Sequence, residues 1–114
     1  MDSSVNRRVV EALVTRAYFQ LVLVAWDDDG SRAALLAKHS DYEVRLVEKL
    51  PEDPAGRPRM WVDLRIKDAE GSMDRRPCGD DLEAAVLAAE RLISQAMQLD
   101  AAARASGGDG DAPQ

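Results

Sequence analysis

Hydrophobic residues recur every three or four positions through the first part of the chain. This spacing runs from residue 4 to residue 25 and predicts a long amphipathic helix, with Ser3 or Ser4 as its N-cap. The second half of this stretch, Tyr18–Trp26, is hydrophobic on nearly every side and rich in residues that favour strands. Tyr18–Trp26 is therefore either the end of this helix or a fully buried strand.

A turn and a second ambiguous segment follow. The sequence Asp-Asp-Asp-Gly at 27–30 predicts a turn, because Asp competes for local backbone hydrogen bonds and Gly accepts a positive φ. The next segment, Arg32–Lys38, contains five consecutive Ala and Leu residues and predicts a short helix. If Tyr18–Trp26 is a strand, Arg32–Lys38 could instead be its hairpin partner.

The centre of the chain alternates between hydrophobic and polar residues, as half-buried strands do. One such strand is predicted over Asp41–Leu50 and a second over Met60–Lys67, with antiparallel pairing between them. The proline-rich segment 51–58 cannot donate to a ladder and is predicted as a loop. After a further turn, Ser72–Arg76 has room for a short edge strand that Pro77 ends.

The last predicted element is a helix with a hydrophobic stripe. Asp80 and Glu83 have the spacing of a capping box, in which each side chain accepts the other residue's backbone N–H. The stripe should pack on the hydrophobic face of the sheet, and comprises Leu82, Ala85, Val86, Ala89, Leu92, Ile93, Ala96 and Leu99. The sequence thus predicts an α+β, two-layer domain: an N-terminal helix, a small antiparallel sheet of two or three strands, possible further strands, and a C-terminal amphipathic helix. This domain spans residues 1–105, and residues 106–114 form a disordered acidic, Gly-rich tail.

The composition limits the chemistry of the protein and the size of its core. The 114 residues suffice for one domain, 46% are hydrophobic, and only 4% are aromatic, so the core is mainly aliphatic. The net charge is −6, and residues 80–114 hold seven acidic and two basic residues. Because binding to nucleic-acid phosphates depends on Lys and Arg, this acidic helix is not expected to lie on nucleic acid.

Few side chains of this chain are suited to catalysis or metal binding. The single histidine, His39, and the single cysteine, Cys78, are each predicted to have structural roles, and the three aspartates at 27–29 lack the alternate spacing of a calcium loop. No Gly-rich phosphate loop is present. We therefore expect no enzymatic activity, no cofactor and no metal. The lone cysteine, the absence of a secretory signal and the short hydrophobic run near residue 20 predict a cytoplasmic protein without a membrane segment.

Two surfaces are candidates for binding. If Tyr18–Trp26 is helical, Tyr18, Phe19, Leu23 and Trp26 provide more hydrophobic area than one core needs, and a second surface should cover it. The preferred hypothesis is a small, bacterial-type binding or adaptor protein that contacts itself as a homodimer, or contacts another protein.

The alternative hypothesis is a nucleic-acid-associated domain. The element order from Ser31 to Met97, a short helix, antiparallel strands and a long helix, resembles that of double-stranded RNA-binding domains. The resemblance would assign nucleic-acid contacts to the basic residues of the hairpin and the edge strand, namely Arg45, Arg65, Lys67, Arg75 and Arg76. These bases alternate with acidic residues, so a mixed, solvated face is the simpler interpretation.

Overall fold

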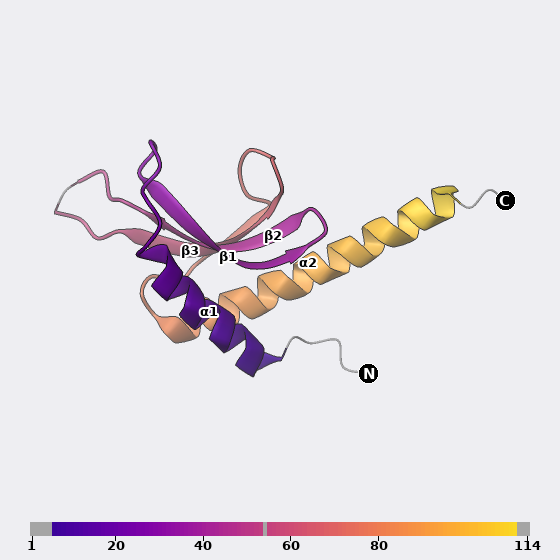
Figure 1. The fold of residues 1–114 in the computed structure, drawn as a ribbon, viewed down its shortest axis with the longest axis horizontal. Coiled ribbons are helices and arrows are strands. Elements are labelled where there is room, and N and C mark those ends of the chain that lie inside the picture. Colours follow the sequence, from indigo (N-terminus) through magenta and orange to yellow (C-terminus); the bar gives the residue numbers. More distant parts are fainter. Residues whose placement is uncertain (1–5, 54, 112–114) are drawn as a thin grey trace.

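A computed structural model describes residues 6–53 and 55–111, with the backbone alone for residues 106–111. Along the chain, one helix precedes and a second helix follows a meander of four antiparallel strands (Figure 1). The elements are α1 (Arg7–Leu21), β1 (Ser31–His39), β2 (Tyr42–Lys49), β3 (Arg59–Ile66), β4 (Asp74–Pro77) and α2 (Leu82–Asp111).

Helix α1 is shorter than its hydrophobic spacing predicts. Asn6 caps it, since the Asn6 Oδ1 accepts the backbone N–H of Arg8 at 2.9 Å. The predicted caps, Ser3 and Ser4, lie outside the described residues. The helix ends at Leu21, so Tyr18–Leu21 is helical, and the strand alternative for Tyr18–Trp26 is wrong.

The predicted helix at Arg32–Lys38 is also wrong, because this segment lies within strand β1. β1 pairs antiparallel with β2, from Ser31 opposite Lys49 to His39 opposite Tyr42. A shift in register between Leu35 and Ala37 accommodates one extra residue, as β-bulges do. Its hairpin partner is therefore β2 rather than Tyr18–Trp26.

The two alternating segments form the central strands as predicted. β2 and β3 pair antiparallel from Tyr42 opposite Ile66 to Lys49 opposite Arg59. β4 is the predicted short edge strand and pairs with β3, with Asp63 opposite Arg75. The sheet has the order β1-β2-β3-β4. Its four strands fit the prediction of two or three strands with room for more.

Both helices cover the same face of the sheet, and the core lies between these two layers (Figure 1). The sheet contributes the even-numbered side chains of its central strands, including Val44, Leu46, Val62 and Leu64, all fully buried. α1 contributes Val10 and Val14 among others, and the buried stripe of α2 extends from Ala85 to Ala96. The protein is thus the predicted α+β, two-layer domain, and it leaves the other face of the sheet without a covering helix.

The start of α2 differs from the predicted capping box by one residue. Asp81, not Asp80, caps this helix: its Oδ1 accepts the backbone N–H of Glu83 at 3.0 Å. Gly79, with φ +57, turns the chain immediately before it. At its other end α2 extends to Asp111, residues 112–114 lie outside the described part, and the boundary at residue 105 stays a prediction. Within the described residues, neither helix combines the length and the apolar character needed to span a membrane.

Candidate functional site

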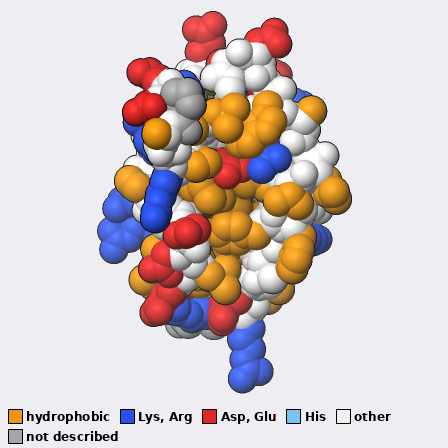
Figure 2. All heavy atoms as spheres, turned by 90° about the vertical axis from the view of Figure 1, so that its left-hand side faces the viewer, with side chains coloured by type: hydrophobic (Ala, Val, Ile, Leu, Met, Phe, Trp, Pro, Cys, Tyr) orange, Lys and Arg blue, Asp and Glu red, His pale blue; other side chains and the backbone are white. Residues whose placement is uncertain are grey.

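The end of α1 and the segment after it expose several large hydrophobic side chains, here called the α1-end patch. It comprises Phe19, Val22, Leu23, Val24 and Trp26. Phe19 and Leu23 are the most accessible, with 71% and 85% of their surface exposed. Figure 2 looks onto this end of the molecule, where hydrophobic side chains lie over the centre of the view with acidic and basic side chains among and beside them. Such a cluster is typical of a surface that another molecule covers.

The outer side of α1 continues this patch as a shallow groove. Phe19 and Leu23 lie at one end of the groove, and Thr15 and Ala12 lie one and two turns before Phe19 on the same side. Glu11 and Arg16 also line it. The groove is therefore mainly apolar along its floor and carries one acidic and one basic group.

The remaining two residues of the predicted partner surface, Tyr18 and Trp26, are less accessible. Tyr18 packs against the core, and its hydroxyl donates to the carbonyl oxygen of Gly79 at 3.4 Å. Burial raises the pKa of this phenol well above its usual range, and the charge of nearby Cys78 adds to the effect. Trp26 is 38% exposed, with the Arg32 guanidinium 4.0 Å from its ring centroid. The structure therefore brings together Phe19 and Leu23, while Tyr18 faces inward.

The second candidate surface is the face of the sheet opposite the helices, here called the open face. The register places six basic and two acidic side chains on it: Lys38, Arg45, Lys49, Arg59, Arg65 and Arg75, with Glu43 and Asp63. An excess of four positive charges thus lies on one face of a chain with a net charge of −6. Glu48, which alternates with these residues in the sequence, lies on the helix side and pairs with Arg32 at 2.8 Å.

Asp63 is held at the centre of the open face although only 1% of it is exposed. Arg45 donates to both of its carboxylate oxygens, from Nε at 3.1 Å and from Nη2 at 2.9 Å. The Ser72 hydroxyl donates to Oδ2 at 2.8 Å. Arg65 binds the same β3–β4 loop, because its Nη2 donates to the carbonyl oxygen of Ala69 at 2.6 Å. This loop rises on the open side of the sheet in Figure 1, and its Ser72 contacts Asp63.

Beside Asp63 the open face is hollowed by about 200 Å³, a space here called the Trp61 hollow. Trp61 is only 9% exposed, and the Arg75 guanidinium lies 4.4 Å from its ring centroid. Lys49 and Arg59 line the hollow, with Asp29 at the turn before β1. Sequence reasoning did not select Trp61 as a site residue, although its alternation with core positions placed it on this face.

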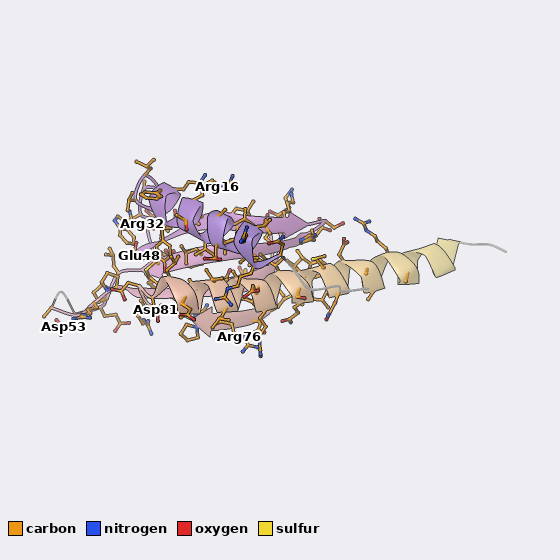
Figure 3. The ribbon with its side chains drawn as sticks, turned by 90° about the horizontal axis from the view of Figure 1, so that it is seen from below. Arg16, Arg32, Glu48, Asp53, Arg76 and Asp81 are labelled. Atoms are coloured by element: carbon orange, nitrogen blue, oxygen red, sulfur yellow. The ribbon has the colours of Figure 1, made fainter. Side chains whose placement is uncertain are left out.

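The predicted nucleic-acid surface is divided by the fold. Arg45, Arg65 and Arg75 lie together at the Trp61 hollow. Arg76 points to the helix side, where it lies beside α2 near Leu87 and Glu90 (Figure 3). Lys67 follows β3, and its backbone N–H donates to Asp41 near the β1–β2 turn.

The single cysteine and the single histidine lie in different parts of the fold. Cys78 is 7% exposed, and burial raises the pKa of its thiol to about 11, with a smaller contribution from the charge of Asp81. A thiol in this state is protonated at neutral pH. His39 lies at the end of β1, and no three His, Cys, Asp or Glu side chains cluster within metal-binding reach in the described ranges.

Comparisons of the chain with models of protein families, with curated proteins and with solved structures find no match.

Proposed function

We propose that this protein is a non-enzymatic binding protein that acts through protein–protein contacts, and that it forms a homodimer through the outer side of α1. The observation that carries this proposal is the exposure of Phe19 and Leu23 on one side of a helix whose other side is packed in the core. Leaving these side chains in water forgoes about 1.5–3 kcal/mol each relative to full burial. A second surface that covers them would recover much of this free energy.

A second copy of the chain suits this surface because its exposed hydrophobic side chains can cover one another. In a two-fold symmetric interface the same patch meets itself. Such an interface sets Phe19 and Leu23 of one copy against Phe19 and Leu23 of the other, and so covers the two most exposed side chains of the groove.

The test is the molar mass in solution, measured by size-exclusion chromatography with light scattering up to high micromolar concentration. We expect a dimer, and we expect Phe19→Ser together with Leu23→Ser to yield a monomer. Leu87→Ser is the matched control, because Leu87 is 52% exposed on α2 and lies outside the groove. A monomeric unsubstituted protein at these concentrations would contradict the proposal.

A second candidate function, contact with nucleic acid, is supported by the excess of positive charge on the open face. Arg65→Glu and Arg75→Glu should each weaken binding to duplex RNA or DNA, and the affinity should fall steeply with salt because phosphate contacts release counterions. The acidic start of α2 argues against it, since Asp80, Asp81 and Glu83 would repel phosphates there. Absence of binding at low salt would eliminate this candidate.

A further inference from the structure

The Trp61 hollow contains three basic side chains that are free of carboxylate partners. Arg45 is neutralised by Asp63, and Arg65 is engaged by the β3–β4 loop. Within the described residues, Lys49, Arg59 and Arg75 form no ion pair. Asp29 is an acidic side chain that also lines the hollow. Its carboxylate accepts hydrogen bonds from the backbone N–H and the hydroxyl of Ser31, at 3.0 and 2.6 Å. The hollow is therefore a concave site with unneutralised positive charge.

A second, independent feature is an unused hydrogen-bond donor on a side chain that lines the hollow. The indole Nε1–H of Trp61 is buried and has no acceptor among the described residues. A buried donor without a partner is costly, and most such groups in proteins have one. Because Trp61 lines the hollow and Arg75 lies over its ring, a ligand that draws Arg75 aside can also supply the missing acceptor.

The size and the donors of the hollow define the chemistry that would fit. About 200 Å³ is below the roughly 300–1,000 Å³ of sites for drug-sized ligands, so it suits one compact group. Two guanidinium groups, one ammonium and one indole N–H require an anion with several acceptor oxygens. A phosphate group has three and carries up to two charges, whereas a carboxylate has two oxygens and one charge.

We propose that the Trp61 hollow binds a phosphate group carried by a phosphate ester. Arg75 and Arg59 donate to its oxygens, Lys49 supplies charge, and the Trp61 indole N–H donates the remaining hydrogen bond. This inference goes beyond self-association through α1. It shares its face with the second candidate function without resting on it, because a single phosphate group needs no polynucleotide.

The fluorescence of Trp61 gives a direct readout, since the proposal moves Arg75 relative to the indole ring. Trp26→Phe leaves Trp61 as the only tryptophan of the chain. Titration of this variant with adenosine monophosphate should give a saturable change in emission, and sodium chloride at equal ionic strength should not. An identical change with chloride, or none with the nucleotide, would overturn the proposal.

Substitutions then assign the site. In the single-tryptophan background, Arg75→Lys keeps the charge and loses the forked donor, and Lys49→Gln removes a charge. Each should raise the dissociation constant about tenfold or more, the effect of one charge-assisted hydrogen bond. Lys38→Gln is the control, because Lys38 is a base of the open face outside the hollow and should change the constant less than about twofold. Equal effects of Lys38→Gln and Lys49→Gln would mean a diffuse charge effect and would refute the site.

Two further ligands distinguish the source of the phosphate. Inorganic phosphate tests the group alone, and a single-stranded oligonucleotide tests the diester form, which has two terminal oxygens and one charge. Binding of inorganic phosphate through Arg75 and Lys49 supports the site for a group with three terminal oxygens, and tighter binding of the oligonucleotide through the same two residues would instead assign the site to a nucleic-acid backbone. Binding of the oligonucleotide that is insensitive to Arg75→Lys and Lys49→Gln would overturn the hollow as the site. None of these outcomes changes the molar mass that tests the dimer.

Discussion

Arg45 and Asp63 face each other across β2 and β3, and Arg45 donates to both carboxylate oxygens of a side chain that is 1% exposed. Their Cα atoms are register partners, so the sheet itself fixes the two side chains side by side. The forked geometry of arginine then satisfies both oxygens at once. A carboxylate is thus retained on the open face at low cost, and it also anchors the β3–β4 loop through Ser72.

Arg45→Ala should therefore be strongly destabilising. It leaves the Asp63 carboxylate buried with only the Ser72 hydroxyl, and breaking a buried ion pair in this way costs about 3 kcal/mol or more. Arg7→Ala is a matched control, because the Arg7–Glu90 pair is exposed and its N–O distance is 3.6 Å. Its loss should cost less than about 1 kcal/mol. Urea denaturation measures both, and similar losses in the two variants would contradict the central role of the Arg45–Asp63 pair.

The N-cap of α2 offers a comparison between adjacent aspartates. Asp81→Ala removes the acceptor for the N–H groups of Glu83 and Ala84, and should lower the free energy of unfolding by about 1 kcal/mol. Asp80→Ala makes the same chemical change one residue earlier and should be close to neutral. Thermal denaturation of the two variants distinguishes them. A larger loss for Asp80→Ala would favour the capping box predicted from the sequence.

β1 provides a similar comparison between Leu35 and Leu36. Leu36 is 3% exposed in the core and Leu35 is 47% exposed on the open face. Leu36→Ala should cost about 3 kcal/mol, within the range for a buried leucine, and Leu35→Ala less than about 1 kcal/mol. Denaturant unfolding gives both values. A larger loss of stability for Leu35→Ala than for Leu36→Ala would mean that Leu35, not Leu36, faces the core.

The strands of the sheet show where local sequence patterns predict the fold and where they do not. The strands β2 and β3 were predictable because Val44, Leu46, Val62 and Leu64 alternate with polar residues over their whole length. The residues of β1 favour a helix by intrinsic propensity, but Ala34 and Leu36 reach the core through pairing with β2. A preference of a few tenths of a kcal/mol per residue is smaller than that pairing and burial, so tertiary context decides.

The two candidate surfaces also differ in how far the sequence predicts them. The exposure of Phe19 and Leu23 was predictable from a helical stripe that one core cannot use. The charge of the open face was not predictable to the same extent, because Glu48 and Asp63 alternate with its basic residues in the sequence. The strand register places Glu48 on the helix side of the sheet, where it pairs with Arg32. Ser72 of the β3–β4 loop contacts Asp63, and no local pattern encodes how that loop folds back.

The burial of Cys78 makes the stability of the fold depend on pH. Burial raises the pKa of the folded thiol to about 11 from its ordinary value of 9.0, so between pH 9 and pH 11 the folded chain retains a proton that the unfolded chain loses. The unfolded state then binds fewer protons, and the free energy of unfolding must fall as pH rises through this window. Below pH 9 this group contributes no slope.

Cys78→Ala should therefore reduce the loss of stability between pH 8 and pH 10.5, as measured by urea denaturation at each pH. The phenol of Tyr18 remains in both proteins. Burial is the main cause of its raised pKa and is common to both, whereas the smaller contribution of Cys78 is lost in the variant. Alkylation by iodoacetamide provides an independent check: at pH 8 the folded thiol should react about 100-fold more slowly than the unfolded thiol, because two pKa units reduce the thiolate fraction by that factor. Equal rates in native buffer and in urea would show instead that Cys78 is accessible as a thiolate, and the Cys78→Ala variant would then keep the full slope.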